Sequence, residues 1–121
     1  IVILGGIPNP DNKKLLVVSK GQGFIVDPCD PTATQELNEQ PILGVIFNES
    51  NNFVVVHDFV KFTAFGIEGR AWKTNPLSFD GLKVKDVSND FIVGEAWSAP
   101  ENEWIEFTLD LKTGTYEGGA R

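Results

Sequence analysis

Three short apolar runs recur along the chain at a spacing of 38 residues, at 14–20, 52–58 and 90–96. Leu15, Phe53 and Phe91 align without a gap. The middle run is rich in β-branched residues and follows polar turn residues, which is the signature of a buried strand after a hairpin turn. A fixed period of this size is typical of a repeat architecture, with chance alignment of apolar runs as the alternative.

The neighbouring residues extend the repeat. A second strand-like run follows each apolar run, at 23–27, 61–65 and 104–109, the last after an insertion at 98–102. Glycine turns and a final strand close the second and third units, whereas 28–31 in the first unit aligns poorly. We therefore predict one domain, 1–121, of three meanders of about four strands. The units span approximately 1–38, 41–78 and 81–118.

Short strands separated by turn signals make this chain all-β, because no segment has helical periodicity. Further strands are expected at 1–4, 42–47, 59–65, 70–74, 82–87 and 115–117. Prolines break the pattern at 28–41, which we interpret as a loop, with a single helical turn at 31–38 as the alternative. The end, 118–121, is expected to be frayed.

Composition excludes several classes of partner. A hydrophobic content of 41% and a charged content of 22% are ordinary for a folded chain of 121 residues. The net charge is −7 and basic residues are few and scattered, so neither nucleic acid nor an anionic membrane is an expected partner. No run approaches the roughly 18 apolar residues of a membrane span. The single cysteine, Cys29, allows no internal disulfide and is compatible with a cytoplasmic location without establishing one.

The stretch 62–74 resembles a blade of the quinoprotein and WD-type β-propellers, in which a strand and a glycine turn precede a strand with Trp, a polar residue and Thr. The stretch 107–114 is similar, with an Asp-x-x-Thr-Gly turn. The Gly-His and Trp-Asp dipeptides of WD repeats are absent. The resemblance implies propeller-blade-like meanders, but propellers typically have four to eight blades. A dimer completing a six-bladed ring, a β-trefoil and a small barrel or sandwich remain as arrangements, with the blade-like one favoured and the trefoil second.

Few residues carry chemistry in a recognisable pattern. His57 and Asp58 are adjacent on a strand and so face opposite sides, which makes a histidine on a strand face the expectation. Cys29 has no base near it in the sequence, and a nucleophile needs one. Asp27 and Asp30 are interpreted as turn formers rather than calcium ligands. We expect no metal, no cofactor and no catalytic residue.

Trp97 and Trp104 flank the insertion and are the best candidates for an exposed ligand-binding rim, together with Glu101 and Glu103. Trp72 is expected to pack in the core. Carboxylates beside aromatic rings also serve glycosidases. The acidic residues near the rim are Asp90, Glu95, Glu101, Glu103 and Glu106.

These features indicate a small non-enzymatic binding or scaffold domain whose partner is a protein or itself. The incomplete number of blades and the edge strands of open meanders favour self-association. The alternative is a carbohydrate-binding domain that uses Trp97 and Trp104. A hydrolase that uses Glu95, Glu101 and Glu103 is the third hypothesis.

Overall fold

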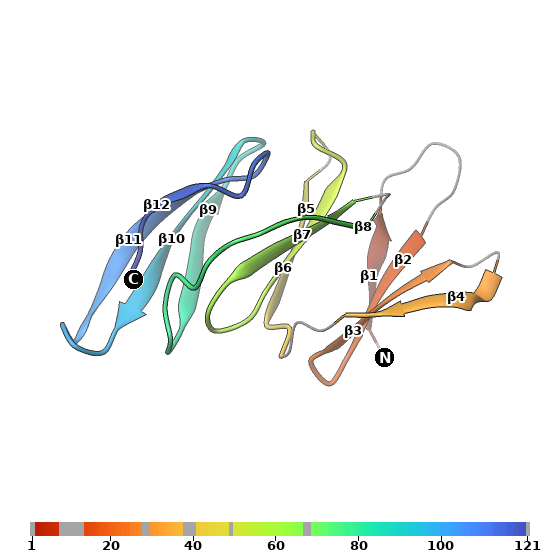
Figure 1. Cartoon of the computed structure of the whole chain (residues 1–121), viewed down its shortest axis with the longest axis horizontal. Coiled ribbons are helices and arrows are strands. Elements are labelled where there is room, and N and C mark those ends of the chain that lie inside the picture. Colours follow the sequence, from red (N-terminus) through yellow and green to blue (C-terminus); the bar gives the residue numbers. More distant parts are fainter. Residues whose placement is uncertain are drawn as a thin grey trace.

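The computed structural model describes residues 2–7, 14–27, 30–37, 41–48, 50–66 and 69–120. These residues form twelve β-strands and no α-helix (Figure 1). The all-β prediction is therefore confirmed.

The strands form three four-stranded antiparallel sheets, and the strands of each sheet follow chain order. The first sheet contains β1 (Val2–Ile7), β2 (Lys14–Ser19), β3 (Gln22–Asp27) and β4 (Asp30–Glu36). The second sheet contains β5 (Gly44–Asn48), β6 (Phe53–His57), β7 (Phe62–Gly66) and β8 (Gly69–Lys73). The third sheet contains β9 (Leu82–Val87), β10 (Phe91–Ser98), β11 (Glu103–Asp110) and β12 (Tyr116–Gly118).

Each sheet is a meander that pairs only with itself. In the described chain, every hydrogen-bonded strand pair lies within one sheet, and no sheet closes on itself. A small barrel or a β-trefoil needs strands that pair around a closed ring. These two alternatives are therefore not the arrangement of the described residues.

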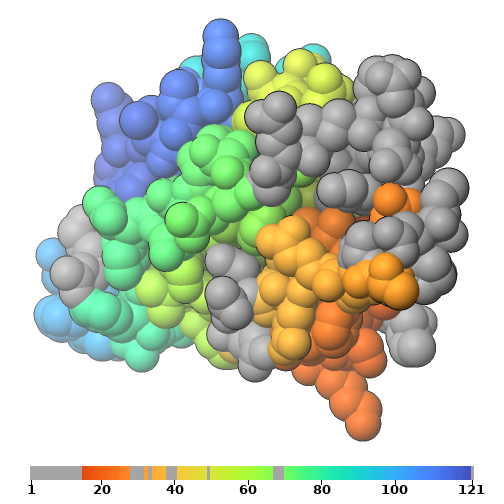
Figure 2. All heavy atoms as spheres, turned by 45° about the vertical axis from the view of Figure 1, so that its right-hand side comes forward, coloured from red at the N-terminus to blue at the C-terminus, as the bar shows by residue number. Residues whose placement is uncertain are grey.

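The three sheets lie side by side along the longest axis of the molecule, with the second sheet in the middle (Figure 1). Figure 2 shows the same order on the surface, from the first sheet in orange through green to the third sheet in blue. Val54, Val55 and Val56 of β6 are consecutive and fully buried. Successive strand residues point to opposite faces, so such a run is buried throughout only when both faces of the sheet are covered.

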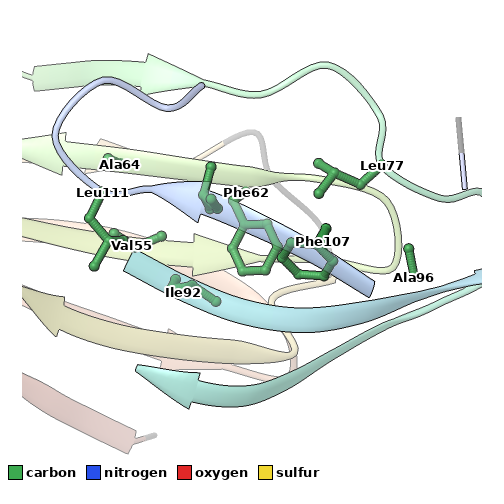
Figure 3. Packing of buried hydrophobic residues seen from close by; sticks show 9 residues of the cluster. Val55, Phe62, Ala64, Leu77, Ile92, Ala96, Phe107 and Leu111 are labelled. Atoms are coloured by element: carbon green, nitrogen blue, oxygen red, sulfur yellow. The ribbon is translucent and has the colours of Figure 1, made fainter. Parts of the chain in front are cut away.

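Two separate hydrophobic cores hold the stack together. The first core, between the first and second sheets, consists of Leu16, Ile25, Leu37, Ile42, Val54, Val56 and Phe65. The second core, between the second and third sheets, consists of Val55, Phe62, Ala64, Leu77, Ile92, Ala96, Phe107, Leu109 and Leu111 (Figure 3). Phe62 and Phe107 meet in the second core with ring centroids 5.7 Å apart. Burying one such side chain contributes about 1.5–3 kcal/mol.

The loop predicted at 28–41 is wrong over Asp30–Glu36, which forms β4. This strand pairs with β3 alone and is the edge of the first sheet. An edge strand tolerates proline because one side of its backbone needs no partner, so Pro31 does not prevent pairing. Thr32 and Thr34 are β-branched residues that favour the extended conformation. Pro28, Cys29 and 38–40 lie outside the described residues.

Three element ends also differ from prediction. The strand expected at 1–4 continues through two glycines to Ile7, with a register shift between Ile3 and Gly5. The stretch 59–61 belongs to a turn rather than to β7. The last described residues are not frayed as predicted for 118–121, because the Ala120 amide donates a hydrogen bond to the Leu77 carbonyl oxygen at 2.7 Å. Ile1 and Arg121 lie outside the described residues.

The match between the first two sheets is offset by one residue from the gap-free alignment. Leu16 pairs with Ile25 across its hairpin and lies in the first core. Leu16 points from the first sheet toward the second. The residue that points from the second sheet toward the third is Val55, 39 positions after Leu16, and Val55 pairs with Ala64. A shift of one residue reverses which face a strand buries. Between the second and third sheets, the spacing of 38 from Val54 to Ile92 keeps both side chains facing the preceding sheet.

Candidate functional site

The outer side of the third sheet carries the residues that the sequence singled out. Along β10, burial alternates, and Ile92 and Ala96 belong to the second core. The intervening residues face away from the second sheet. We call this surface the third outer face. Its members on β9, β10 and β11 are Lys83, Asp86, Phe91, Val93, Glu95, Trp97, Trp104, Glu106, Thr108 and Asp110, together with Lys85, which contacts Glu95.

The structure brings Trp97 and Trp104 together. They are directly opposite in the register of β10 and β11, with ring centroids 5.4 Å apart in an edge-to-face geometry. The Lys83 ammonium lies 4.1 Å from the centroid of a Trp104 ring, a cation–π contact. Both indoles are half-buried. The predicted aromatic pair is therefore present, but Lys83 covers one face of Trp104.

The acidic residues are spread over different surfaces. Glu95 lies opposite Glu106 on the third outer face, and the Lys85 ammonium is 4.0 Å from the Glu95 carboxylate. Glu101 is exposed in the turn that joins β10 and β11. Glu103 pairs with the buried Ser98, so it faces the side opposite to Glu95. The carboxylates of the hydrolase hypothesis do not converge on one point.

His57, the last residue of β6, packs against residues of the adjacent strands β5 and β7. Its ring centroid is 5.1 Å from that of Phe62, and its Nδ1 is 3.1 Å from the Asp58 carbonyl oxygen. A Cβ atom added at Gly44 would collide with the imidazole, so glycine there provides its space. Within the described ranges, no three His, Cys, Asp or Glu side chains are grouped to hold a metal ion. His57 is a packed residue on a strand face, as predicted.

Asp58 is buried and organises the turn between β6 and β7. Its Oδ1 accepts the Val60 and Lys61 amides at 2.7 and 2.8 Å, and its Oδ2 is 3.1 Å from the Lys61 ammonium. Burial alone would raise the pKa of this carboxyl, but the hydrogen bonds and the charge of Lys61 outweigh it and lower the pKa. All these partners belong to one turn, which gives Asp58 a structural role.

The outer side of the first sheet carries a surface that the sequence reading did not single out. Leu15 pairs with Val26 and Val17 pairs with Phe24, and all four side chains point away from the second sheet. We call these residues the first outer face. They are half-buried and belong to neither core. At the β4 edge, the exposed Glu36 lies opposite Phe24 and accepts a hydrogen bond from Gln22.

The sequence does contain a signal for this surface. Leu15-Leu16-Val17-Val18 is a continuous apolar run, the pattern of a strand buried on both faces. In the second sheet the corresponding run is covered on both faces by the flanking sheets. In the first sheet, the second sheet covers Leu16 and leaves Leu15 and Val17 on the other side.

Comparison with known proteins finds no family model, no curated protein and no solved structure that matches this chain. Among the described residues, no helix is long and apolar enough to cross a bilayer.

Proposed function

We propose that this chain is a non-enzymatic interaction module that associates with itself through a stack of blade-like sheets. The observation that carries the proposal is the first outer face, a group of four apolar side chains on the side away from the second sheet. The four side chains are half-buried, and covering their remaining apolar area removes it from water, which favours association.

A recurring backbone contact supports the blade-like repeat. In each sheet, the residue that follows the fourth strand donates its amide to a carbonyl of the third strand. The contacts are Leu37 to Gly23 at 2.9 Å, Thr74 to Phe62 at 3.0 Å and Gly119 to Glu106 at 3.1 Å. Three sheets that close in the same way are consistent with three copies of one structural unit.

The turn after β11 supports the same proposal. The Asp110 carboxylate accepts the Lys112 and Thr113 amides at 2.8 and 3.3 Å, and the Gly114 amide donates to the Asp110 carbonyl oxygen at 2.8 Å. Gly114 has a φ of 79°, a conformation that favours glycine. This is the geometry that an Asp-x-x-Thr-Gly turn needs between the last two strands of a meander.

The solution mass tests the proposed function. Light scattering on a size-exclusion column, over a wide range of loading concentrations, is expected to give a mass above the 13.3 kDa of one chain as concentration rises. A mass of one chain at every concentration would overturn self-association.

Carbohydrate binding is a second candidate, supported by the contact between Trp97 and Trp104 on the third outer face. Because Lys83 covers one face of Trp104, Trp97 is the indole expected to stack on a sugar ring. Intrinsic fluorescence across a glycan panel is expected to change in the wild type and not in Trp97→Ala. An unchanged wild-type spectrum with every glycan would reject this candidate.

A further inference from the structure

We infer that a hollow at one end of the third outer face, between the Phe91 ring and the Asp110 and Glu117 carboxylates, binds a primary ammonium or guanidinium group. The ligand class is a small organic cation, either free or carried by a lysine or arginine side chain. This inference goes beyond the proposed function, because the hollow uses neither the first outer face nor the indole of Trp97.

The hollow spans three neighbouring strands of the third sheet, which lies at one end of the stack (Figure 1). Phe91 on β10 lies opposite Asp110 on β11, and Thr108 on β11 lies opposite Glu117 on β12. These registers place an aromatic ring, a hydroxyl and two carboxylates on one side of the sheet. The volume is about 370 Å³, within the range of small-ligand sites. The lining residues are Phe91, Thr108, Asp110, Thr115, Tyr116 and Glu117.

Phe91 provides the aromatic surface of the hollow. Its side chain is 44% exposed, whereas phenylalanine is usually buried. The face of an aromatic ring carries negative charge density, which attracts a cation placed over it. The exposed ring is therefore suited to a positively charged group.

The two carboxylates are open to a ligand. Asp110 is positioned by the Lys112 and Thr113 amides, which donate to its Oδ1. Its Oδ2 has no hydrogen-bond partner among the described residues, and Glu117 is exposed. Neither carboxylate forms an ion pair within the described part of the chain. Two negative charges thus lie beside the ring without a neutralising partner.

The other end of the third outer face shows the same chemistry with cations in contact. There, the Lys83 ammonium lies 4.1 Å from the centroid of a Trp104 ring, and the Lys85 ammonium lies 4.0 Å from the Glu95 carboxylate. At the Phe91 end, a ring and carboxylates are again together, but no lysine or arginine is among the described residues that line the hollow. By this comparison, the complementary group is a cation that a ligand supplies.

The polar atoms of the hollow favour a cation that carries N–H groups. The carboxylates of Asp110 and Glu117 and the hydroxyls of Thr108 and Thr115 can each accept a hydrogen bond. A quaternary ammonium has no N–H to donate, and proteins bind it with several aromatic rings. We therefore expect a primary ammonium or a guanidinium to bind more tightly than tetramethylammonium.

The openness of the hollow predicts weak binding. Exposed ion pairs and single cation–π contacts each contribute little, so we expect dissociation constants on the order of millimolar. The net charge of −7 attracts cations to the chain, and salt screens this attraction. Affinity is therefore expected to fall as the salt concentration rises.

The deciding experiment titrates the isotope-labelled chain with butylammonium and follows its amide signals by two-dimensional NMR. Saturable shifts are expected at residues 91, 108 and 115–117. The neutral analogue butanol is expected to cause no saturable shift. An acetylated, amidated Ala-Lys-Ala tripeptide distinguishes the two sources of the cation, because its binding supports a protein side chain, whereas binding of butylammonium alone supports a free amine.

Two pairs of variants locate the site. Glu117→Gln is expected to weaken butylammonium binding by about threefold. Glu101→Gln removes the same charge from the exposed turn between β10 and β11 and is expected to leave binding unchanged. Phe91→Leu is expected to weaken binding, whereas Phe59→Leu replaces an exposed ring in the turn between β6 and β7 and should not. The NMR spectra also show whether each variant is folded.

Three results would overturn the inference. The first is a titration in which neither butylammonium nor butylguanidinium causes saturable shifts. The second is binding of butanol as tight as that of butylammonium, which would show an apolar contact without charge recognition. The third is equal weakening by Glu117→Gln and Glu101→Gln, which would show only a general attraction of cations to an acidic chain.

Discussion

The indole Nε1 of Trp72 donates a hydrogen bond to the Leu111 carbonyl oxygen at 3.0 Å. Trp72 lies on β8 at the edge of the second sheet, and Leu111 follows β11 in the third sheet. This bond joins the two sheets at the margin of the second core, against which the indole also packs. The core role expected for Trp72 is therefore confirmed.

Replacing Trp72 with Phe removes this donor and leaves the Leu111 carbonyl without its side-chain partner. We expect a loss of about 1–3 kcal/mol in the free energy of unfolding. Urea denaturation followed by circular dichroism measures it. Trp97→Phe on the third outer face is the matched control and is expected to cost less. Equal losses in the two variants would contradict a linking role for Trp72.

Gly114 lies against the indole ring of Trp72. A Cβ atom there would lie 2.6 Å from the Trp72 ring, and the φ of 79° already disfavours a side chain. Gly114→Ala is expected to destabilise the fold by roughly 1–3 kcal/mol or more. Gly119→Ala has a comparable φ of 87° but its nearest contact is 3.3 Å away, so it isolates the backbone cost. The thermal midpoint should fall further for Gly114→Ala, and the reverse order would refute the steric argument.

Two buried threonines predict changes of opposite sign. The Thr63 hydroxyl is buried and has no hydrogen-bond partner among the described residues, so Thr63→Val is expected to stabilise the fold by about 1 kcal/mol. The Thr74 hydroxyl oxygen accepts the Phe62 amide at 3.1 Å. Thr74→Val is therefore expected to destabilise by about 1–2 kcal/mol. Chemical denaturation of both variants checks the pair, and changes of the same sign would contradict it.

Asp58 makes the free energy of unfolding depend on pH. Its pKa is lowered in the folded state from an ordinary value of 3.8, so the folded protein favours the carboxylate. The resulting stability is fully present above the ordinary pKa and is lost as the pH falls through the folded pKa. Asp58→Asn is expected to lose about 1 kcal/mol at neutral pH, because the charge-assisted bonds are gone.

The same variant should approach the wild type in stability below the folded pKa, where the wild-type carboxyl is protonated. Thermal unfolding at a series of pH values from neutral to strongly acidic measures the difference. Glu101→Gln, in the exposed turn, is the control and should change little. A constant difference between Asp58→Asn and wild type across the whole series would rule out this linkage.

Much of the architecture follows from local pattern. The β-branched run at Phe53–His57 and the alternating run at Phe91–Ser98 are strands where the periodicity predicts them. The positions of Trp97 and Trp104 around a four-residue turn led to their contact, because a hairpin register places them opposite each other. By contrast, β4 was missed because Pro31 reads as a strand breaker, and only its edge position makes it acceptable.

The amino-acid sequence determined that this chain forms short antiparallel strands in three meanders, since side-chain alternation and turn residues act locally. Only the tertiary structure decided which side of each strand is covered. Leu16 corresponds to Val55 rather than Val54, and a continuous apolar run looks the same with either face buried. The stacking of the sheets decides which face of a strand is buried, because a strand residue belongs to the core only where a neighbouring sheet packs against its face.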